Sequence, residues 1–388
     1  MKFKLALVSA ALMSCITANA AEPTNEELRQ LIDAQQKEIN ELKESVKKAD
    51  KKAEASVEAA EKSMNNSASS KLSFGGYGEL HYNNIEDKES IDFHRFVTFM
   101  GYQFTDSIRF FSELELEHSL SGDGKPGEVE LEQAYVEIDV TDATSIKSGL
   151  FLVPVGILNE THEPPTFYGV ERNPIEKNII PTTWWEAGAG VTSKLAEGLT
   201  ADFAIHSGLE VPNDAGVYDF SIRSGRQKVA KANADSFAYT ARIKYTAIPG
   251  LELAASVQHQ TDLTQGVLNA DANLYTAHAI YNVDGFGIRA LYAGWDIDSA
   301  EAEMNGQDKQ DGFFVEPSYR FNDEFGIFAR YSVWDNAAGN SSINTEMKQS
   351  NVGFNYWPHE NVVFKFDLEN RSGAQDGNGF NLGVGYQF

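Results

Sequence analysis

The sequence predicts an all-β transmembrane barrel of about 16 antiparallel strands, preceded by an N-terminal α-helical coiled-coil segment. Short segments that alternate between apolar and small or polar residues recur from residue 72 to the end of the chain. The links between these segments alternate between short and long, as in membrane barrels with turns on one side and loops on the other. The final segment places an apolar side chain at every second position from Phe380 to Phe388.

The composition agrees with this fold class. Hydrophobic residues make up 42% of the 388-residue chain, and no run of 18 apolar residues occurs, which excludes a helical membrane protein. A barrel can be this polar because only every second strand residue meets lipid. The one cysteine, Cys15, lies in a segment that we expect to be removed, and a mature chain without thiols suits an oxidising compartment.

The negative charge is concentrated in the expected barrel. The formal net charge is -25 at pH 7. Residues 72–388 hold 21 basic and 46 acidic side chains, whereas residues 21–71 hold nine basic and eleven acidic ones. Such an acidic surface argues against nucleic acid as a partner.

The chain begins like a secretory signal peptide. Two lysines and an apolar run are followed by the small residues Ala18 and Ala20. This pattern predicts a signal peptide over residues 1–20. Lipoprotein-type cleavage before Cys15 is the weaker alternative, because the bulky Met13 lies close to that cleavage point.

Residues 21–64 are expected to form a periplasmic coiled coil. From Asn25 to Met64 the chain has no glycine, proline or aromatic residue and is rich in helix formers. Its apolar positions step by threes and fours, although the seam fades after Val46, so a solvated helical spacer is the alternative. Residues 65–71 are expected to be a polar hinge before the barrel domain, residues 72–388.

The alternating segments define the expected strands. We place them near residues 72–83, 91–104, 107–119, 129–140, 144–152, 184–195, 198–210, 236–247, 250–262, 272–283, 286–297, 311–322, 325–335, 347–357, 361–371 and 379–388. An even number of strands puts both ends of the barrel, and the helix, in the periplasm. The alternation changes phase near Gln133, which predicts a β-bulge or an early end of the lipid-facing belt. The five tryptophans lie near strand ends, which is typical of interfacial girdles; core positions in a soluble fold are the alternative.

One link stands apart from the others. Residues 153–183, the third external loop, contain 31 residues and five prolines. Long ordered loops are usually functional, and we expect this one to fold inward and constrict a water-filled lumen. A packed surface flap is the alternative. Its charged or titratable candidates for the constriction are Glu160, His162, Glu163, Glu171, Arg172, Glu176 and Lys177.

Strand parity assigns charged side chains to the lumen. The acidic ones are Glu113, Glu115 and Glu117. The basic ones are Arg109, Arg242, Lys244, Arg289, Arg320, Arg330, Lys365 and Arg371. An early carboxylate-rich wall facing a later basic wall predicts a transverse field that orients solutes. The alternative is that neighbouring charges pair and are solvated.

The sequence offers no catalytic motif. It contains no Gly-Xaa-Ser-Xaa-Gly elbow, paired-cysteine motif or phosphate-binding loop. His81, two positions from Glu79, is expected to form a hydrated lumen pair rather than a metal site. We therefore expect no enzyme activity, no cofactor and no metal.

Four local patterns resemble the phosphate-selective porin O and P family over roughly residues 72–388. They are Gly75-Gly76-Tyr77-Gly78-Glu79-Leu80-His81-Tyr82, Glu113-Leu114-Glu115-Leu116-Glu117, the stretch from Gly149 to Gly156 through Asn159-Glu160, and the Phe388 ending. The resemblance implies a sixteen-stranded outer-membrane channel, usually a homotrimer, for passive diffusion of small solutes, with phosphate or other anions as candidates. Selective members use basic lumen ladders, whereas this barrel is acidic, so the solute stays open.

The resemblance and the terminal strand also predict partners. The ending, with Tyr386 and Phe388, resembles the closing strand that the barrel-assembly machinery reads as a sorting signal. Outer-membrane lipid and a small permeating solute are the other expected partners. The alternative function is a structural tether, in which the coiled coil links envelope layers and the barrel is an anchor.

Overall fold

A computed structural model of the chain describes residues 71–86, 88–211, 213–214 and 217–388. The expected signal peptide, coiled coil and hinge lie outside the described residues, apart from Lys71 at the end of the hinge. Within the described part, no helix has the length and apolar character needed to span a bilayer.

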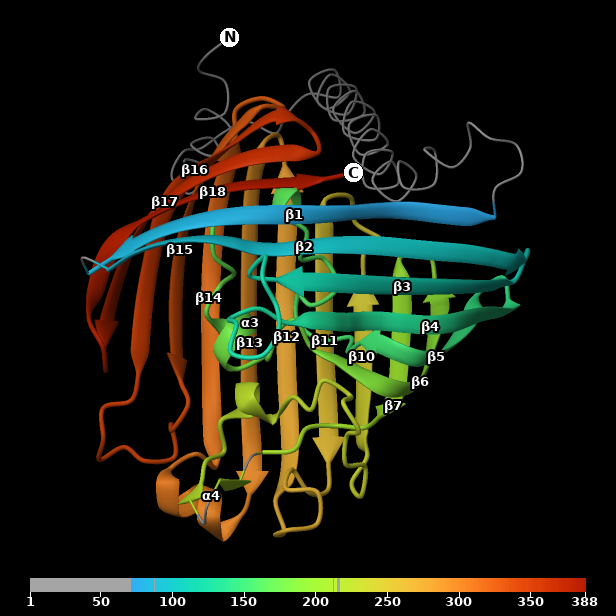
Figure 1. The fold of residues 1–388 in the computed structure, drawn as a ribbon, viewed down its shortest axis with the longest axis vertical. Coiled ribbons are helices and arrows are strands. Elements are labelled where there is room, and N and C mark those ends of the chain that lie inside the picture. Colours follow the sequence, from blue (N-terminus) through green and yellow to red (C-terminus); the bar gives the residue numbers. More distant parts are fainter. Residues whose placement is uncertain (1–70, 87, 212, 215–216) are drawn as a thin grey trace, which may run out of the picture. The chain divides into compact units, whose positions relative to one another are not determined.

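Sixteen strands of the described chain close into one antiparallel barrel. Each pairs with its sequence neighbour, and β1 pairs with β18 to close the ring (Figure 1). All sixteen expected strands are present, which confirms the predicted barrel. The strands are β1 (Leu72–Ile85), β2 (Lys88–Thr105), β3 (Ile108–Glu117), β4 (Val129–Thr141), β5 (Thr144–Leu152), β6 (Trp185–Ala196), β7 (Leu199–His206), β10 (Ala238–Tyr245), β11 (Leu251–Gln260), β12 (Asp271–Val283), β13 (Phe286–Asp298), β14 (Lys309–Arg320), β15 (Phe325–Asp335), β16 (Met347–His359), β17 (Val362–Gly373) and β18 (Gly377–Gln387).

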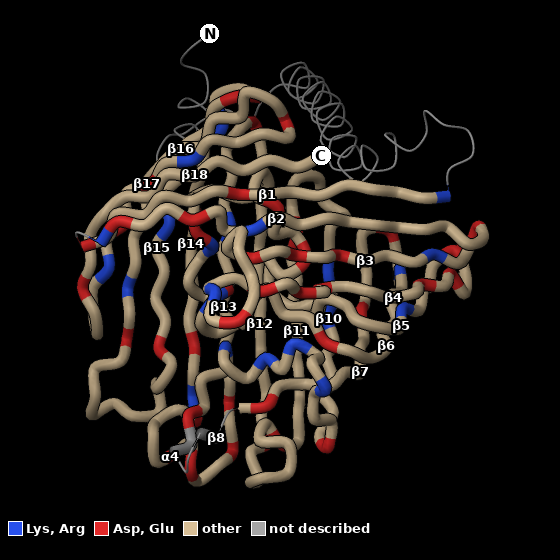
Figure 2. Tube along the Cα trace, in the orientation of Figure 1, with Lys and Arg blue, Asp and Glu red and all other residues tan. Residues whose placement is uncertain are grey.

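The barrel is apolar outside and polar inside. Along β10 and β11, the side chains of Ile243 and Val257 are 51% and 41% exposed, whereas Arg242, Ser256 and Gln258 are buried. Burial alternates in the same way along β12, β14 and β15. Exposed apolar positions suit contact with lipid, and buried polar positions suit a hydrated interior. Charges of both signs follow the strands (Figure 2).

The last residue lies at the seam that closes the barrel. The Phe388 amide donates to the Gly76 carbonyl at 2.8 Å, and the Gly76 amide donates to the Phe388 carbonyl at 2.9 Å. The Phe388 ring lies 6.4 Å from the Phe74 ring and 6.3 Å from the Phe96 ring, centre to centre. The end of the chain therefore contributes to closure, while its role as an assembly signal stays a prediction.

A β-bulge lies where the alternation changes phase. Glu113 of β3 pairs with Gln133 of β4, but the next residue, Leu114, pairs with Leu131, so Glu132 is the extra residue. This confirms the bulge predicted near Gln133. The Glu132 side chain is 1% exposed, beside the equally buried Glu113. A bulge re-aims one side chain, and here it brings a second carboxylate to the buried face.

The long links contain short elements of their own. The link between β5 and β6 contains η1 (Pro164–Thr166) and α3 (Ile175–Asn178). The link between β7 and β10 contains β8 (Asn213–Asp214), β9 (Val217–Tyr218) and η2 (Ile222–Gly225), and α4 (Ala300–Asn305) follows β13. We refer to residues 153–184 as loop A and residues 207–237 as loop B.

An apolar cluster joins the two loops to the strands. Loop A contributes Ile175, Ile179 and Trp184, and loop B contributes Leu209 and Phe220. Strand residues of the same cluster are Leu274, Leu291, Trp295, Phe314 and Trp334. Burial of apolar side chains is the main stabilising contribution to packing of this kind.

The tryptophans are buried, three of them in this cluster, and the girdle interpretation is wrong for them. All five, Trp184, Trp185, Trp295, Trp334 and Trp357, are at most 8% exposed. Trp295 Nε1 donates to the Ile179 carbonyl at 2.9 Å, and Trp357 Nε1 donates to the Pro165 carbonyl at 3.3 Å. Buried indole N–H groups need acceptors, and loop A supplies them for these two tryptophans.

Candidate functional site

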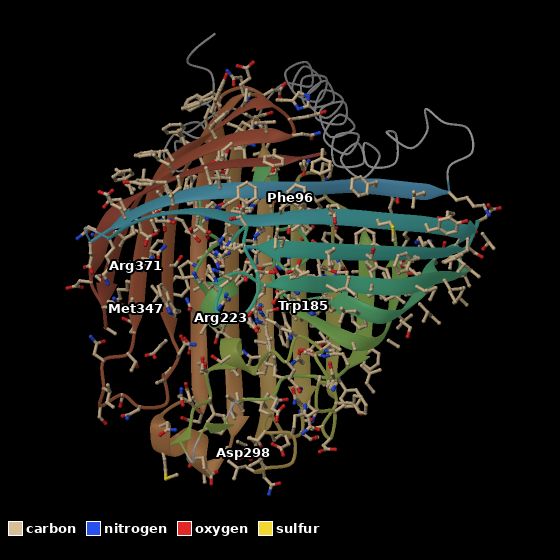
Figure 3. All side chains as sticks on the ribbon, viewed as in Figure 1. Phe96, Trp185, Arg223, Asp298, Met347 and Arg371 are labelled. Carbon is tan, nitrogen blue, oxygen red and sulfur yellow. The ribbon has the colours of Figure 1, made fainter. Side chains whose placement is uncertain are left out.

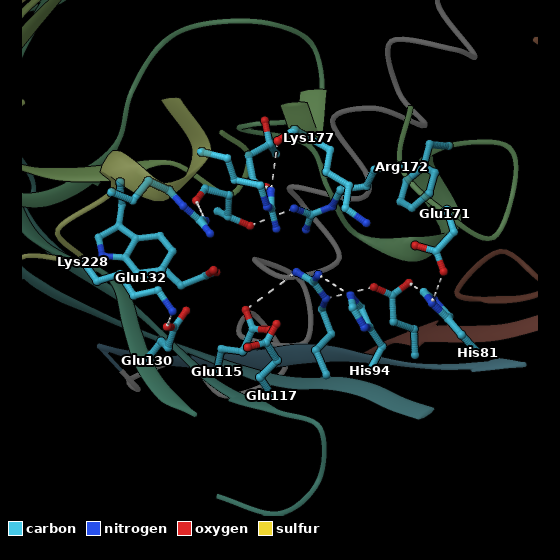
Figure 4. Close-up of a pocket in the computed structure, with 18 of the residues that line it drawn as sticks. His81, His94, Glu115, Glu117, Glu130, Glu132, Glu171, Arg172, Lys177 and Lys228 are labelled. Carbon is cyan, nitrogen blue, oxygen red and sulfur yellow. Dashed lines mark hydrogen bonds and ion pairs between the residues drawn. The ribbon is translucent and has the colours of Figure 1, made fainter. Parts of the chain in front are cut away.

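A charged pocket lies between strands β1 to β4 and the two loops (Figure 4). Its lining holds six carboxylates and six lysines or arginines, so neither sign dominates. The carboxylates are Glu79, Glu115, Glu117, Glu130, Glu132 and Glu171. The bases are Arg95, Arg172, Lys177, Arg223, Arg226 and Lys228.

The acidic wall of this pocket comes from β3 and β4. Glu115 pairs in register with Glu130, and Glu117 and Glu132 lie two residues away along the same strands. Alternation along a strand places residues two apart on the same face, so the predicted inward set on β3 is consistent with this wall. Glu130 and Glu132 were not among the predicted site residues, because the bulge in β4 changes which residues face inward.

The basic wall comes from the loops. Arg172 of loop A donates to Thr183 Oγ1 at 3.0 Å. Arg223 of loop B donates to the carbonyl of Lys177 at 3.2 Å, and Arg226 donates to the carbonyl of Thr183 at 2.6 Å. Among the described residues, none of these three guanidinium groups forms an ion pair with a carboxylate. Neutral acceptors hold them, so their charge is directed to the pocket. Figure 3 labels Arg223 and Trp185, which both line it.

The pKa values of the loop arginines reflect this crowding. Burial, followed by the charges of Arg226 and Arg172, lowers the pKa of Arg223 to about 10. Burial, followed by the charge of Arg95, lowers the pKa of Arg172 below its usual value. For both arginines burial is the larger cause, and the neighbouring positive charges lower the pKa further.

Ion pairs connect the two walls at the edges of the pocket. Arg95 Nε lies 2.9 Å from Glu79 Oε1, and Arg95 Nη1 lies 3.7 Å from Glu115 Oε2. At the other end, Lys228 of loop B pairs with Glu128 and Glu130. The edges are therefore partly neutralised, and the uncompensated arginines face the carboxylates between them.

The predicted loop residues divide into three groups. Glu171, Arg172 and Lys177 line the pocket. Glu160 pairs with Arg242 of β10, and His162 Nε2 lies 3.4 Å from Glu113 Oε1 of β3.

The remaining two loop residues are held by other means. Glu176 is fully buried, and its Oε1 accepts hydrogen bonds from the amides of Ile157 and Leu158, both at 2.6 Å. Burial raises the pKa of Glu176, against the lowering effect of these hydrogen bonds. It therefore organises loop A and does not line the pocket. Burial also raises the pKa of Glu163.

Loop A contacts strands all around the barrel. Glu171 lies 3.1 Å from His81 Nδ1 of β1. Arg289 of β13 donates to the Thr166 carbonyl at 2.9 Å, and the Val170 amide donates to Asp367 of β17 at 2.9 Å. Burial would raise the pKa of Glu171, but the hydrogen bond from His81 and the charge of that residue hold it well below its usual range. Glu171 is thus an anionic anchor between the loop and β1.

The predicted later basic wall does not line this pocket. Most of its arginines pair with carboxylates on the same or a neighbouring strand: Arg242 with Asp202 at 2.8 Å, Arg330 with Glu316 at 2.7 Å, and Arg371 with Glu369 at 2.5 Å. The register places Asp202 directly opposite Arg242, and Glu369 and Arg371 lie two residues apart on β17, so acid and base are side by side. The pairing alternative is the better description of these residues.

The other predicted lumen bases have separate surroundings. Arg109 pairs with Glu137 and Asp139 at 2.9 and 2.7 Å. Lys365 lies 3.5 Å from the centre of the Phe167 ring, and Arg320 lies 4.3 Å from that of Trp357. Lys244 is half-buried on β10. None of them lines the charged pocket, whose described lining takes its bases from β2 and the loops.

Sequence reasoning missed Arg223, Arg226 and Lys228, because strand parity says nothing about the link between the expected strands 198–210 and 236–247. A signal was present. Three basic residues fall within the six positions from Arg223 to Lys228, in a barrel region with a large acidic excess. A local basic run in an acidic chain indicates a segment that contacts negatively charged groups.

Comparisons with known proteins agree with the fold. No family model matches the chain. An uncharacterized protein of Aquifex aeolicus is 35% identical over 236 residues, which cover 58% of this chain and 51% of the relative, so the chain spans about half of the length of that relative.

Three solved structures share the architecture. The anion-selective porin from Comamonas acidovorans has 11% identity over 82% of this chain and 99% of its own, with a TM-score of 0.60. The outer membrane channel DcaP of Acinetobacter baumannii has 14% identity over 82% of this chain and 97% of its own, with a TM-score of 0.58. The trimer form of in-vitro folded OmpT, an outer membrane protein of Vibrio cholerae, has 12% identity over 82% of this chain and 99% of its own, with a TM-score of 0.54. At these identities the likeness shows the fold alone.

Proposed function

We propose that the protein is an outer-membrane porin, through which small hydrophilic or charged solutes diffuse passively along a water-filled path. The observation that carries the proposal is the pair of facing walls, with Glu115, Glu117 and Glu132 opposite Arg172, Arg223 and Arg226. Fixed charges of opposite sign across a narrow path create a field that orients a dipolar solute. The apolar exterior of the sixteen-stranded barrel suits a membrane location.

Loop A, in this proposal, folds inward and narrows the path. Its hydrogen bonds and ion pairs reach β1, β10, β13 and β17, which lie in different parts of the ring. A segment held by so many strands at once has its contacts inside the wall that they enclose. The anchors Glu171 and Glu160 keep it there.

The charges of the pocket suit charged and dipolar solutes in general, rather than anions alone. Its equal numbers of acids and bases differ from a basic ladder, so the proposal names phosphate and other anions as candidates to be tested rather than as the defined cargo. The similarity to the phosphate-selective porin O and P family stays a sequence-based prediction. In this proposal the solute passes by diffusion alone, without bond chemistry.

We also propose a homotrimer whose N-terminal segment lies in the periplasm and whose last strand is read by the barrel-assembly machinery. The trimer form of the OmpT structure supports the first point, and the position of Phe388 at the barrel seam supports the last. Cross-linking in detergent followed by electrophoresis would give a three-chain species if the assembly is correct. A species that stays at one chain would contradict it.

Planar-bilayer recording tests the channel proposal. Purified, folded protein is added to one side, and single-channel current steps and the reversal potential are recorded in a potassium chloride gradient, with phosphate and sugars added as competitors. We expect discrete conductance steps, and competition by phosphate would identify it as a permeant. Folded protein without conductance steps would overturn the proposal. A variant without residues 21–70 should keep the conductance, whereas the tether alternative requires loss of envelope attachment.

A further inference from the structure

We propose that Glu113, Glu132 and His162 form a binding site for one divalent transition-metal ion of the zinc class. The three side chains come from β3, from the bulge of β4 and from loop A. Their potential ligand atoms all lie within 4.8 Å of one another, and each residue is at most 3% exposed. The ion would join loop A to the barrel wall, and this inference does not depend on the proposed transport function.

The distances match a metal coordination sphere. His162 Nε2 lies 3.4 Å from Glu113 Oε1 and 3.8 Å from Glu132 Oε2. Zinc binds nitrogen and oxygen ligands at about 2.0–2.2 Å, so two ligands of a tetrahedral ion lie roughly 3.4 Å apart. The two distances from His162 Nε2 are within about 0.4 Å of this value, and the two carboxylate oxygens, which lie within 4.8 Å of each other, would move closer together on binding.

Within the described chain, the three atoms lack hydrogen-bond partners, as does the hydroxyl of Tyr77, whose ring lies 5.7 Å from that of His162, centre to centre. Among the described residues, Glu113 Oε1, Glu132 Oε2 and His162 Nε2 have no hydrogen-bond partner. The remaining polar atoms of two of these side chains are occupied, since Glu113 Oε2 accepts from Gln133 Nε2 at 2.6 Å and His162 Nδ1 contacts the Asn159 carbonyl at 3.2 Å. Buried polar atoms without partners are costly, and three that converge point to a shared cation.

The Asn159 carbonyl determines which nitrogen of His162 is available. A carbonyl oxygen only accepts, so Nδ1 carries the hydrogen, and Nε2 faces the carboxylates. With a neutral ring, the Nε2 lone pair would meet two carboxylate oxygens, which is repulsive. Metal-binding histidines characteristically donate their other N–H to a carbonyl or carboxylate in this way. A proton on Nε2 is the competing explanation, and the experiment below separates the two.

The donor set selects the class of ion. Sites for magnesium and calcium consist of oxygen ligands, whereas an imidazole favours zinc and its transition-metal neighbours. Two carboxylates and one imidazole leave a further position for water. Glu132 also lines the charged pocket, which gives an ion a path to the site.

A second cluster of similar residues serves as the control. Asp92, His94 and His118 also bring possible ligand atoms together. However, Asp92 Oδ2 lies 3.1 Å from His94 Nδ1 and 2.8 Å from His118 Nδ1, so its oxygen already accepts hydrogen bonds. These side chains are partly exposed rather than buried. The cluster has two histidines, which distinguishes it spectroscopically from a site with one.

The experiment measures metal binding by the full-length protein in detergent after removal of bound ions with a chelator. Zinc is titrated by calorimetry, and cobalt is used as an optical substitute. We expect one equivalent per chain, with an affinity that falls at least tenfold in His162→Gln and in Glu132→Gln and is unchanged in His118→Gln. X-ray absorption of the zinc-loaded wild type should show one imidazole among oxygen ligands.

Two results would overturn the assignment. One is the absence of stoichiometric binding, which would leave a protonated His162 between the carboxylates. The other is binding that is lost in His118→Gln, or that shows two imidazoles, which would place the ion on the second cluster. If a variant fails to fold, as judged by heat-modifiable gel mobility, the X-ray absorption spectrum of the zinc-loaded wild type decides between one and two imidazole ligands. Conductance is recorded separately, so a failure of the channel proposal and a failure of this one are distinguishable.

Discussion

Replacement of Arg223 and Arg226 by glutamine should convert the pocket from balanced charge to an excess of two negative charges. Both arginines belong to loop B and are held by backbone carbonyls rather than by carboxylates. Glutamine keeps a hydrogen-bond donor for those carbonyls and removes the charge. The double variant should therefore fold normally and differ mainly in its electrostatic field.

The expected change follows from Coulomb's law. A unit charge acts on an ion 4 Å away with about 1 kcal/mol in water, and at about twice that distance with roughly 0.5 kcal/mol. Screening at about 0.1 M salt approximately halves this value. Two lost charges then change the free energy of a cation and of an anion in opposite directions by roughly 0.5 kcal/mol each. The cation-to-anion permeability ratio should rise about fivefold.

The assay is the reversal potential of single channels in a potassium chloride gradient. The matched variant of opposite sign, Glu115→Gln with Glu117→Gln, should lower the same ratio by a comparable factor. Lys348→Gln removes a positive charge from the outer face, where Lys348 pairs with Glu346 at 2.8 Å, and should change nothing. If the arginine variant keeps the wild-type ratio while it folds and conducts, the facing walls do not lie on the permeation path.

Three further predictions concern stability, measured as the denaturant midpoint of protein folded into lipid vesicles. The pKa of Glu171 is lowered, so the stability from its contact with His81 is present above the ordinary glutamate pKa of about 4.3 and is lost as the pH falls below that value. In this acidic range the denaturant midpoint of the wild type should fall more steeply with pH than that of Glu171→Gln. Parallel curves for the two proteins would refute the prediction. Glu176→Ala leaves the buried amides of Ile157 and Leu158 without an acceptor and should lower the free energy of unfolding by about 1–3 kcal/mol. The open-channel current of this variant should also be noisier. An unchanged denaturant midpoint would show that loop A rearranges to satisfy the two amides. Gly188→Ala places a Cβ 2.8 Å from the Cα of His206 and should lower the free energy of unfolding by about 1–3 kcal/mol. Gly190→Ala, whose Cβ has its nearest atom at 3.4 Å, should be close to neutral. Equal effects of the two substitutions would contradict the packing argument.

The barrel itself was predictable because its information is local. Alternation of side chains has a period of two residues, so each strand shows which face is apolar without knowledge of its partner. The alternation also indicated either a bulge or an early end of the lipid-facing belt, since Val129 and Leu131 are out of phase with Ala134 and Val136, and the register shows the bulge. The inward orientation of Glu115 and Glu117 follows from the same parity.

The site was only partly predictable because its halves come from different kinds of segment. The acidic wall belongs to strands and obeys parity. The basic wall depends on where Arg223 and Arg226 are placed by loop B, which lies about 100 residues further along the chain than β3. Parity also cannot show that Arg330 meets Glu316, because that requires the register between two strands.

By itself, the sequence determined the number of strands, their order along the chain and which face of each regularly alternating strand is apolar, since these follow from short-range alternation and turn lengths. The tertiary structure alone decided which charges are neutralised, which arginines stay free to face the carboxylates, and that the tryptophans pack inside rather than at a girdle. It also brought His162 to Glu113 and Glu132. The physical reason is that charge pairing, desolvation and ligand geometry act over a few ångströms in space, between residues whose separation along the chain carries no record of that distance.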